Sequence, residues 1–268
     1  MEISTLIGLI GGIGFLIGAF VMEGGSPMAL LILTAGMIVF GGTFGALCVA
    51  FPLESVLSLG KHMASTFKKV ERKSPQLIEA LVQLAETARR EGLLALESMI
   101  EGEKGYDPML KRGIQLVVDG TDPEFVKNLL ELEVKMHDKK ANEGVELLAA
   151  VGGFLPTMGV IGTVMGLVSV LSNLSNPDEL GGKVAVAFVA TLYGVGFANL
   201  VALPMSVKLK GKAAVEKMER LLIIEGVLSI QAGENPRLIE EKLKAFLILN
   251  GSEKKTAKST EEKSETEE

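Results

Sequence analysis

The feature that most restricts this chain is a pair of long apolar runs, residues 147–176 and 184–207, which contain no Asp, Glu, Lys, Arg or His. A helix that crosses a bilayer needs about 20 mainly apolar residues, and each run is long enough. Each run also contains a proline, Pro156 in the first and Pro204 in the second. Proline removes a helical hydrogen bond, and in lipid the freed backbone must be satisfied by neighbouring helices, hydroxyls or water. We therefore interpret the two runs as a membrane hairpin whose prolines face protein or a hydrated path.

Hydroxyl side chains lie near both prolines, notably Thr163, Thr191 and Tyr193, and from them we predict that the hairpin lines an ion path. The alternative for each threonine is a hydrogen bond to a carbonyl of its own helix. Ion-coupled machines usually bind the ion with an intramembrane carboxylate. None of the apolar runs contains one. The chain is therefore a passive structural protein, a pore lined by hydroxyls and backbone, or half of a two-component machine whose partner supplies the acid.

Two further apolar runs, residues 3–22 and 28–51, open the chain and are joined by a short Glu-Gly-Gly-Ser-Pro turn. The chain has 31 glycines, 11 phenylalanines, 2 tyrosines and no tryptophan, a composition that suits close helix contact in a membrane. We predict a second helical hairpin here. Glycines at the small-xxx-small spacing are expected to let its helices approach closely: Gly8/Gly12, Gly14/Gly18 and Gly41/Gly45.

Residues 52–146 are charged and leucine-rich, and their apolar side chains recur at helical spacing. Ser74, followed by Pro75, is predicted to cap a helix there. The fold class is therefore an all-α integral membrane protein with four transmembrane helices in two hairpins, a large helical cytoplasmic insert between helices 2 and 3, and a cytoplasmic C-terminal helix and tail. The predicted divisions are a hairpin (1–51), the insert (52–146), the hairpin lining the ion path (147–207), C-terminal helices (208–250) and a disordered charged tail (251–268).

Charge distribution sets the expected orientation in the membrane. Of the 27 Lys and Arg residues, all except Lys183 lie in the insert or after residue 207. The positive-inside rule then places the insert, the tail and both termini in the cytoplasm. The net charge of −6 argues against general affinity for nucleic acid.

Enzyme motifs and metal-ligand spacings are missing from the sequence. It has no HExxH and no Gly-x-Ser-x-Gly, and the single cysteine, Cys48, stands inside an apolar run. The two histidines, His62 and His137, are expected to be solvated or structural. We predict no catalytic residues, no metal and no cofactor.

Arg89 and Glu97 in the insert stand eight residues apart, a spacing that puts both on one face if the helix is continuous through Gly92. A charged ridge of this kind could make salt-sensitive contacts with a partner. The alternative is an ordinary solvated face.

These features together resemble the MotA/PomA family, the A-subunits of the bacterial flagellar stator. The resemblance covers residues 1–247. It depends on the two hairpins with their insert, on PTMGVIGTVMGL at 156–167, on ATLYG at 190–194 with Asn199 and Pro204, and on ARREGLLALE at 88–97.

The resemblance implies a ring of A-subunits, pentameric by the family's pattern, in the bacterial inner membrane around B-subunits (MotB/PomB-like) that carry the membrane aspartate. It implies that ion flow turns the ring and that the insert pushes the rotor protein FliG. Arg89, Arg90 and Glu97 match the rotor-contact residues of the family. Pro156 and Pro204 match the prolines tied to torque. The positions that match the channel lining are Thr163, Thr191, Tyr193 and Ala190.

The transported ion is expected to be the proton. Sodium-type members have a threonine pair before Leu-Tyr-Gly, and here the first of the pair is Ala190. Sodium is the alternative. The alternative functions are an energiser subunit of the ExbB/TolQ type, which usually has three membrane helices, and a small transporter, which usually has more helices and polar groups at the midplane.

Overall fold

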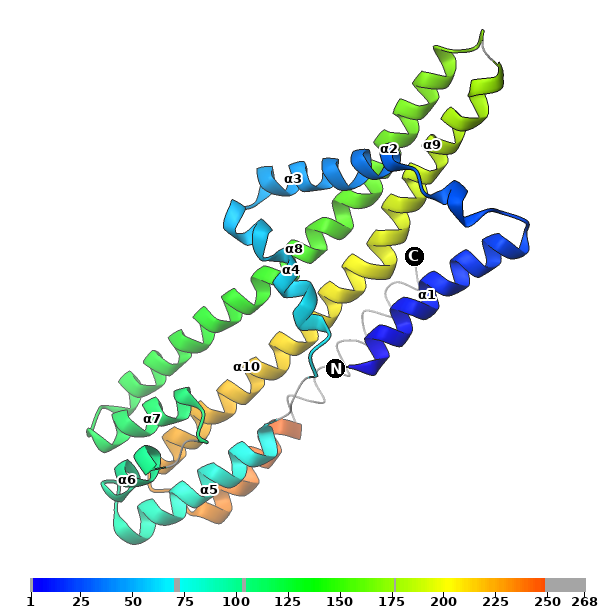
Figure 1. Cartoon of the computed structure of the whole chain (residues 1–268). Helices are drawn as coiled ribbons and strands as arrows, with labels where there is room; N and C mark the ends of the chain where they lie inside the picture. The colour runs from blue at the N-terminus through cyan, green and yellow to red at the C-terminus, as the bar shows by residue number, and fades with distance from the viewer. Residues whose placement is uncertain (1, 70–72, 103–104, 176, 249–268) are drawn as a thin grey trace, which may run out of the picture. The chain divides into compact units, whose positions relative to one another are not determined.

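The computed structural model describes residues 2–69, 73–102, 105–175 and 177–248, so the predicted disordered tail lies outside the described residues. Throughout these ranges the regular structure is helical (Figure 1). A last helical stretch covers residues 236–248. The other elements are α1 (Ile3–Met22), η1 (Pro27–Leu30), α2 (Leu33–Gly36), η2 (Met37–Gly41), α3 (Gly42–Ala50), α4 (Leu53–Thr66), α5 (Ser74–Glu91), α6 (Ala95–Gly102), α7 (Pro108–Val118), α8 (Pro123–Leu171), α9 (Pro177–Phe197), η3 (Ala198–Ala202) and α10 (Leu203–Gln231).

Four helical segments among the described residues are long and apolar enough to cross a membrane, which confirms the predicted number of spans. They are Ile3–Met22, Pro27–Ala50, Pro123–Leu171 and Leu180–Gln231. The last two are much longer than a bilayer requires, because each continues from an apolar run into charged sequence. α8 alone has 49 residues. The charged residues before Leu147 are good helix formers, so nothing ends the helix where its composition changes.

The second span is not one regular helix, in contrast to the first. A 3₁₀ turn (η1) precedes Leu31 and Ile32, which are not helical, and a π turn (η2) lies between α2 and α3. Apolar composition alone indicated a span here, but it does not reveal where the backbone leaves the α-helix. Leu30 and Ile32 therefore need hydrogen-bond partners from elsewhere.

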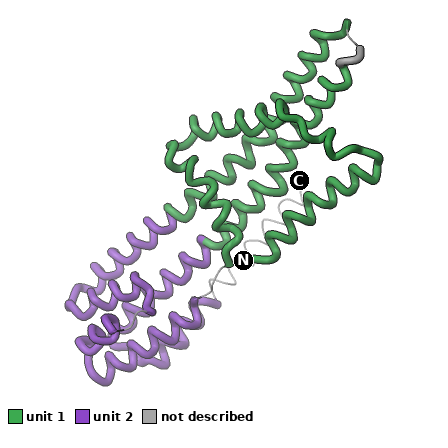
Figure 2. The backbone as a smooth tube through the Cα atoms, in the orientation of Figure 1, with its two compact units in different colours: residues 1–70, 140–212 green, residues 71–139, 213–268 purple. Residues whose placement is uncertain are grey.

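The chain divides into two compact units (Figure 2). The first, here called the apolar unit, contains residues 1–70 and 140–212. The second, the charged unit, combines residues 71–139 with 213–268. The central part of the predicted insert, residues 71–139, is thus packed with the C-terminal helices, whereas residues 52–70 and 140–146 belong to the apolar unit. Helical periodicity does not disclose this division.

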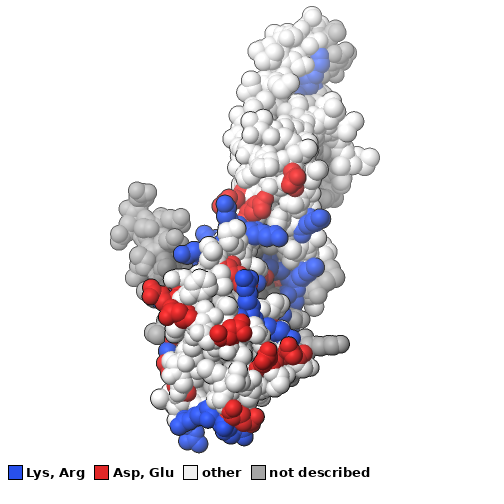
Figure 3. All heavy atoms as spheres, turned by 90° about the vertical axis from the view of Figure 1, so that its left-hand side faces the viewer, with Lys and Arg blue, Asp and Glu red and all other residues white. Residues whose placement is uncertain are grey.

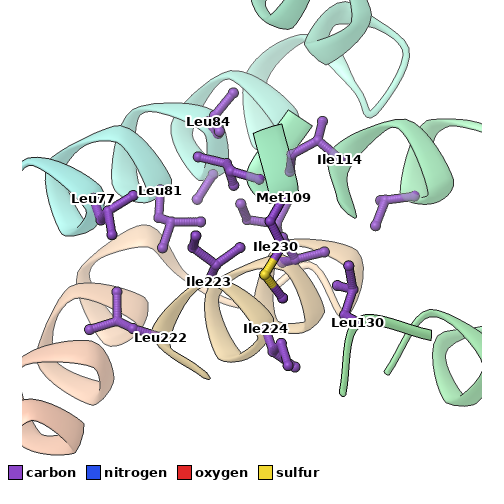
Figure 4. Close-up of a cluster of buried hydrophobic side chains, with 14 of the residues drawn as sticks. Leu77, Leu81, Leu84, Met109, Ile114, Leu130, Leu222, Ile223, Ile224 and Ile230 are labelled. Carbon is purple, nitrogen blue, oxygen red and sulfur yellow. The ribbon is translucent and has the colours of Figure 1, made fainter. Parts of the chain in front are cut away.

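The core of the charged unit is made of aliphatic side chains from α5, α6, α7, α8, α10 and the last helical stretch (Figure 4). Each fully buried Leu or Ile contributes roughly 1.5–3 kcal/mol of transfer free energy, so this core is the main source of the unit's stability. Its fully buried members include Leu81, Leu84, Leu96, Leu110, Ile114, Leu130, Leu222 and Leu243.

The start of α5 differs from the sequence prediction. Ser74 is the first residue of the helix and Lys73 precedes it, so Ser74 does not act as the N-cap. Glu219 of α10, which is largely buried, accepts hydrogen bonds from the Lys73 backbone N–H at 2.5 Å and from the Ser74 hydroxyl at 3.3 Å. A carboxylate at a helix N-terminus satisfies an otherwise unpaired N–H, so a residue distant in sequence does the work of the expected cap.

Candidate functional site

α8 and α9 approach each other closely in the apolar unit. An added Cβ at Gly159 would lie 3.0 Å from the Ala190 carbonyl oxygen, and one at Gly162 would lie 2.6 Å from the Ala190 Cβ. Backbone contact of this kind requires small residues on both helices. The contact is formed by Gly159, Gly162 and Gly166 on α8 and by Ala187, Ala190 and Gly194 on α9.

Thr163 and Thr191 meet across this contact. Their hydroxyl oxygens are within hydrogen-bond reach of each other. The Thr163 hydroxyl also lies 3.1 Å from the Gly159 carbonyl oxygen of its own helix and 3.0 Å from the Ala187 carbonyl oxygen of α9. The Thr163 hydroxyl is therefore within hydrogen-bond distance of a carbonyl of its own helix, the predicted alternative, and also of a carbonyl of α9. Both residues are only half-buried, so the pair lies at the edge of the helix contact and not in a sealed core.

Ala190 is fully buried, and its methyl group packs against Gly162. The structure therefore places Ala190 inside the contact between α8 and α9, next to Thr191 in sequence but without exposure of its own. A larger residue at this position would need space from α8.

Tyr193 forms hydrogen bonds with the backbone of the second span where that span is not helical. Its hydroxyl donates to the Leu30 carbonyl at 2.5 Å and accepts from the Ile32 N–H at 3.3 Å. Its ring belongs to an aromatic cluster with Phe40 of η2 and Phe197 of α9, in which the Phe40 and Phe197 ring centroids are 4.8 Å apart. Tyr193 thus supplies the backbone partners that Leu30 and Ile32 lack, and it ties the second span to α9.

The two prolines are linked by the packing of α10 against α8. Pro156 stands inside α8, and the carbonyl that it leaves unbonded is that of Gly152, four residues earlier. Leu203, the residue before Pro204, packs on the bare α-carbon of Gly152. Pro204 itself follows the π turn η3, whose wider spacing accommodates the missing N–H. Neither proline ends its helix.

Arg89 and Arg90 occupy the last turn of α5, and Glu97 the first turn of α6. Gly92, with φ +84°, separates the two helices, so the shared face expected of one continuous helix does not form. All three charged side chains are exposed. Arg89 also borders a cavity of about 140 Å³ between the ends of α5 and α10. Figure 3 shows the charged side chains gathered over the charged unit and sparse over the apolar helices.

The first residues of α1 are tied to the end of the fourth apolar run. The Lys208 ammonium pairs with the Glu2 carboxylate and reaches the Thr5 hydroxyl. The Glu2 N–H donates to the Phe67 carbonyl at 2.9 Å. The start of the first span and the first charge after the fourth run are therefore neighbours within the apolar unit. His62 of α4 packs on Gly144 of α8 in the same unit, where it fills space that a Cβ would occupy.

The sequence singled out Thr163, Thr191, Tyr193, Arg89 and Glu97 as candidates, but it did not single out the small residues that join α8 to α9. The signal was present, because Gly159, Gly162 and Gly166 recur on one helix face. The glycine pairs of the first two spans showed the same signal. Within the described part of this chain, however, a Cβ added at Gly8, Gly14, Gly18, Gly41 or Gly45 would have no neighbour within 4 Å. Spacing identifies a face that permits close contact and does not say which helix uses it.

Comparison with known protein families gives two matches. The profile of the MotA/TolQ/ExbB proton channel family matches residues 101–221, and that of the motility protein A N-terminal region matches residues 6–92.

Curated relatives match over most of their length. The chain is 37% identical over 247 residues to chemotaxis protein PomA of Vibrio alginolyticus, which covers 92% of this chain and 96% of the relative. It is 37% identical over 252 residues to motility protein A of Bacillus subtilis, covering 92% and 91%.

Solved structures match the fold. A structure of C. jejuni MotAB superposes with a TM-score of 0.84 at 30% identity, over 92% of this chain and 96% of that chain. The flagellar MotAB stator complex of Bacillus subtilis superposes with a TM-score of 0.82 at 36% identity, over 91% and 96%.

Proposed function

Because the chain belongs to the motility protein A (MotA/PomA) family within the MotA/TolQ/ExbB proton channels, we propose that it is the A-subunit of a flagellar stator. In this role it forms an ion path and converts ion flow into motion of its cytoplasmic part. The family consists of channel subunits and is not an enzyme family. The observation that carries the proposal is the tight α8–α9 pair, which presents two paired hydroxyls and no Asp, Glu, Lys, Arg or His side chain from either apolar run.

A carboxylate from another chain completes the ion path in this proposal. The two similar structures are complexes with a second protein, MotB. We propose that a MotB-like subunit inserts its membrane aspartate beside Thr163 and Thr191, and that several copies of this chain, five by family pattern, surround it as a ring. The half-buried hydroxyl pair supports this arrangement, because it offers hydrogen-bonding groups on a surface that is otherwise apolar.

The transported ion is proposed to be the proton, with sodium as the alternative. A sodium ion crossing a membrane must exchange its hydration shell for several oxygen ligands. The Thr163 hydroxyl has one proton to share among the Gly159 carbonyl, the Ala187 carbonyl and Thr191, and Ala190 supplies no oxygen from its side chain. The side chains at these three positions therefore offer two hydroxyl oxygens, fewer than the several ligands that a desolvated cation requires.

The proposed location is the bacterial inner membrane, with both termini in the cytoplasm. The concentration of Lys and Arg in the insert and after residue 207 supports this orientation. The Glu2–Lys208 pair supports it further, because it puts the beginning of the first span at the same end as the first charge after the fourth.

The charged unit is proposed to contact the rotor protein FliG through Arg89, Arg90 and Glu97. Their exposure at the adjoining ends of α5 and α6 supports this role. Pro156 and Pro204 are proposed to couple the ion path to that surface. The packing of Leu203 on Gly152 supports coupling, since a shift at either proline must displace the other helix.

The proposed function predicts that this chain conducts little on its own. Coexpression with its MotB-like partner should give ion flux into vesicles, and a partner whose membrane Asp is replaced by Asn should not. The physical reason is that no group of the apolar runs can take up and release a proton near neutral pH. Flux should be measured with a pH-sensitive dye, with and without a sodium gradient. Strong flux from this chain alone would exclude the two-component mechanism, and flux that requires sodium would reverse the choice of ion.

Charge reversal at the rotor surface should weaken binding to the rotor protein and leave assembly intact. An exposed ion pair contributes about 0.2–1 kcal/mol, so Arg89→Glu or Glu97→Lys should weaken binding about twofold to thirtyfold once attraction becomes repulsion. Lys127→Glu is the matched control, since Lys127 is exposed on α8 of the same unit. Binding should be measured at low and high salt. Equal binding by Arg89→Glu, Glu97→Lys and the control would remove these residues from the contact.

A further inference from the structure

A group of lysines lies where the charge-free runs of the apolar unit end. Segments 61–73 and 208–212 contain eight Lys and Arg residues and a single acid, although the whole chain has a net charge of −6. Four of these lysines belong to the apolar unit and are brought together by contacts between its segments. We call them the basic cluster: Lys68, Lys69, Lys208 and Lys212.

Contacts between distant segments hold the basic cluster together. The Lys212 ammonium donates to the backbone carbonyl of Lys68, the second residue after α4, and to a carbonyl in the last turn of α4 at 2.7 Å. The Phe67 carbonyl accepts from the Glu2 N–H at 2.9 Å. Lys208, about one helical turn before Lys212 on α10, pairs with the Glu2 carboxylate. The end of α4, the start of the first span and the end of the fourth run therefore meet.

α4 follows the level at which the charge-free runs end. Near its start, Val56 packs with Leu47 and Leu147, which lie at the ends of the second and third runs. Just after its end, Phe67 packs against buried residues of α8 and α10 where the third run begins and the fourth run ends. Both ends of α4 are thus at the same boundary, which is the placement of a helix in the membrane interface.

Exposed apolar side chains lie directly beside the basic cluster. Ile3 and Val207 are next in sequence to the two members of the Glu2–Lys208 pair, and they are 70% and 71% exposed. Ile7, about one turn further along α1, is exposed as well. The same place therefore offers ammonium groups to an anion and apolar surface to hydrocarbon attached to that anion.

We propose that the basic cluster binds the phosphate group of an anionic phospholipid, whose acyl chains lie along the exposed start of α1 and end of the fourth run. Clusters of about four to eight Lys and Arg residues directly beside a membrane span are typical of anionic-lipid recognition. Lys208 and Lys212 stand four residues apart on one helix, where like charges repel, and an anion beside them offsets that repulsion. The inference goes beyond the proposed function, because it depends neither on ion flow nor on the rotor.

The position of the basic cluster favours a lipid over a soluble phosphate compound. A soluble anion gains nothing from Ile3, Ile7 and Val207, whereas a phospholipid at this level covers them with its chains. Lysine is a flexible point charge and imposes no fixed two-pronged geometry on its anion. The site should therefore distinguish lipids by charge and not by headgroup shape, so phosphatidylglycerol and phosphatidylserine should bind alike.

Native mass spectrometry of the full chain in complex with its MotB-like partner tests the proposal. The delipidated complex is titrated with phosphatidylglycerol or with phosphatidylcholine, which has the same chains and no net charge. Phosphatidylglycerol should bind more tightly. Lys68→Gln with Lys69→Gln removes two exposed ammonium groups. At about fivefold per lysine, this variant should weaken phosphatidylglycerol binding about twenty-five-fold and leave phosphatidylcholine binding unchanged.

Lys127→Gln with Lys135→Gln is the matched control. Both lysines are exposed on α8 in the charged unit, and the variant changes the net charge by the same amount. It should bind phosphatidylglycerol as the unmodified chain does. Equal affinity for the two lipids, or an equal loss in the control and the cluster variant, would overturn the proposal. Displacement of phosphatidylglycerol by inorganic phosphate at equal concentration would also overturn it, since the site would then take a soluble anion.

Melting temperature separates a lost lipid site from a lost fold. Lys68→Gln with Lys69→Gln keeps the backbone carbonyls that bind Glu2 and Lys212, so melting in phosphatidylcholine should be unchanged. Added phosphatidylglycerol should raise the melting temperature of the unmodified chain and of the control, because a ligand of the folded state stabilises it, and should raise that of the cluster variant much less. A rise of equal size in all three proteins would refute the site.

Discussion

Gly194→Ala is expected to separate α8 from α9 and to abolish the assembled channel. The new Cβ would lie 3.1 Å from the Gly159 Cα and closer still to the Leu155 carbonyl oxygen. Both obstacles are backbone atoms, which cannot rotate away as a side chain can. Overpacking typically costs about 1–3 kcal/mol and more where nothing can yield, so we expect a loss at or above the upper end of that range.

Gly196→Ala provides the control for this change. Gly196 is on the same helix two residues later, and an added Cβ there has no neighbour within 4 Å. Thermal stability in detergent and the yield of membrane-inserted protein should fall for Gly194→Ala and remain near the unmodified values for Gly196→Ala. Similar behaviour of the two variants would show that the helix pair is not held at backbone contact.

Tyr193→Phe is expected to destabilise the non-helical segment of the second span around Leu31 and Ile32. The substitution removes only the hydroxyl, so the Leu30 carbonyl and the Ile32 N–H both lose their partner. An unsatisfied buried polar group costs about 1–3 kcal/mol, and in an apolar surrounding water does not easily replace the lost bond. Two fully buried groups would cost about 2–6 kcal/mol together, and since Leu30 and Ile32 are half-buried we expect a loss near the lower end of that range, with the change concentrated at residues 30–32.

Hydrogen exchange distinguishes this effect from lost packing. The Ile32 amide should exchange faster in Tyr193→Phe, which keeps the ring beside Phe40 and Phe197. Phe40→Leu removes part of the ring packing and leaves both hydrogen bonds, so the Ile32 amide should remain protected. If Tyr193→Phe left this amide as protected as before, the hydroxyl would not be the partner that holds it.

The sequence was sufficient for the spans and for the identity of the exposed charged residues. Charge-free length predicts where a membrane helix can lie, and helical spacing predicts which face of α5 enters a core. Both signals depend only on residues that are near one another in sequence, so they can be read without knowledge of the fold. The prediction of four spans and of a helical insert rested on them and was confirmed.

What the sequence could not supply are contacts between distant residues. Glu219 caps α5 from α10, and Tyr193 bonds Leu30 and Ile32 across more than half the chain. No spacing rule connects such positions, because the pairing depends on which helices become neighbours. The interruption at Gly92 was visible as a glycine, but only its φ of +84° settles that Arg89 and Glu97 belong to separate helices.

The π turn from Ala198 to Ala202 also rotates the side chains of α10 about the helix axis, relative to those of α9. A π turn holds one residue more than the α turn it replaces, which is equivalent to a rotation of about 100° for the rest of the helix. The faces of α10 thus stand about a quarter turn from where an uninterrupted α-helix begun at Pro177 would set them. A one-residue deletion in this turn would restore regular helix and keep every residue of α10, yet it would point Ser206 away from its partner, the Val145 carbonyl. The single extra residue therefore determines which side of the first turns of α10 faces α8 within the apolar unit.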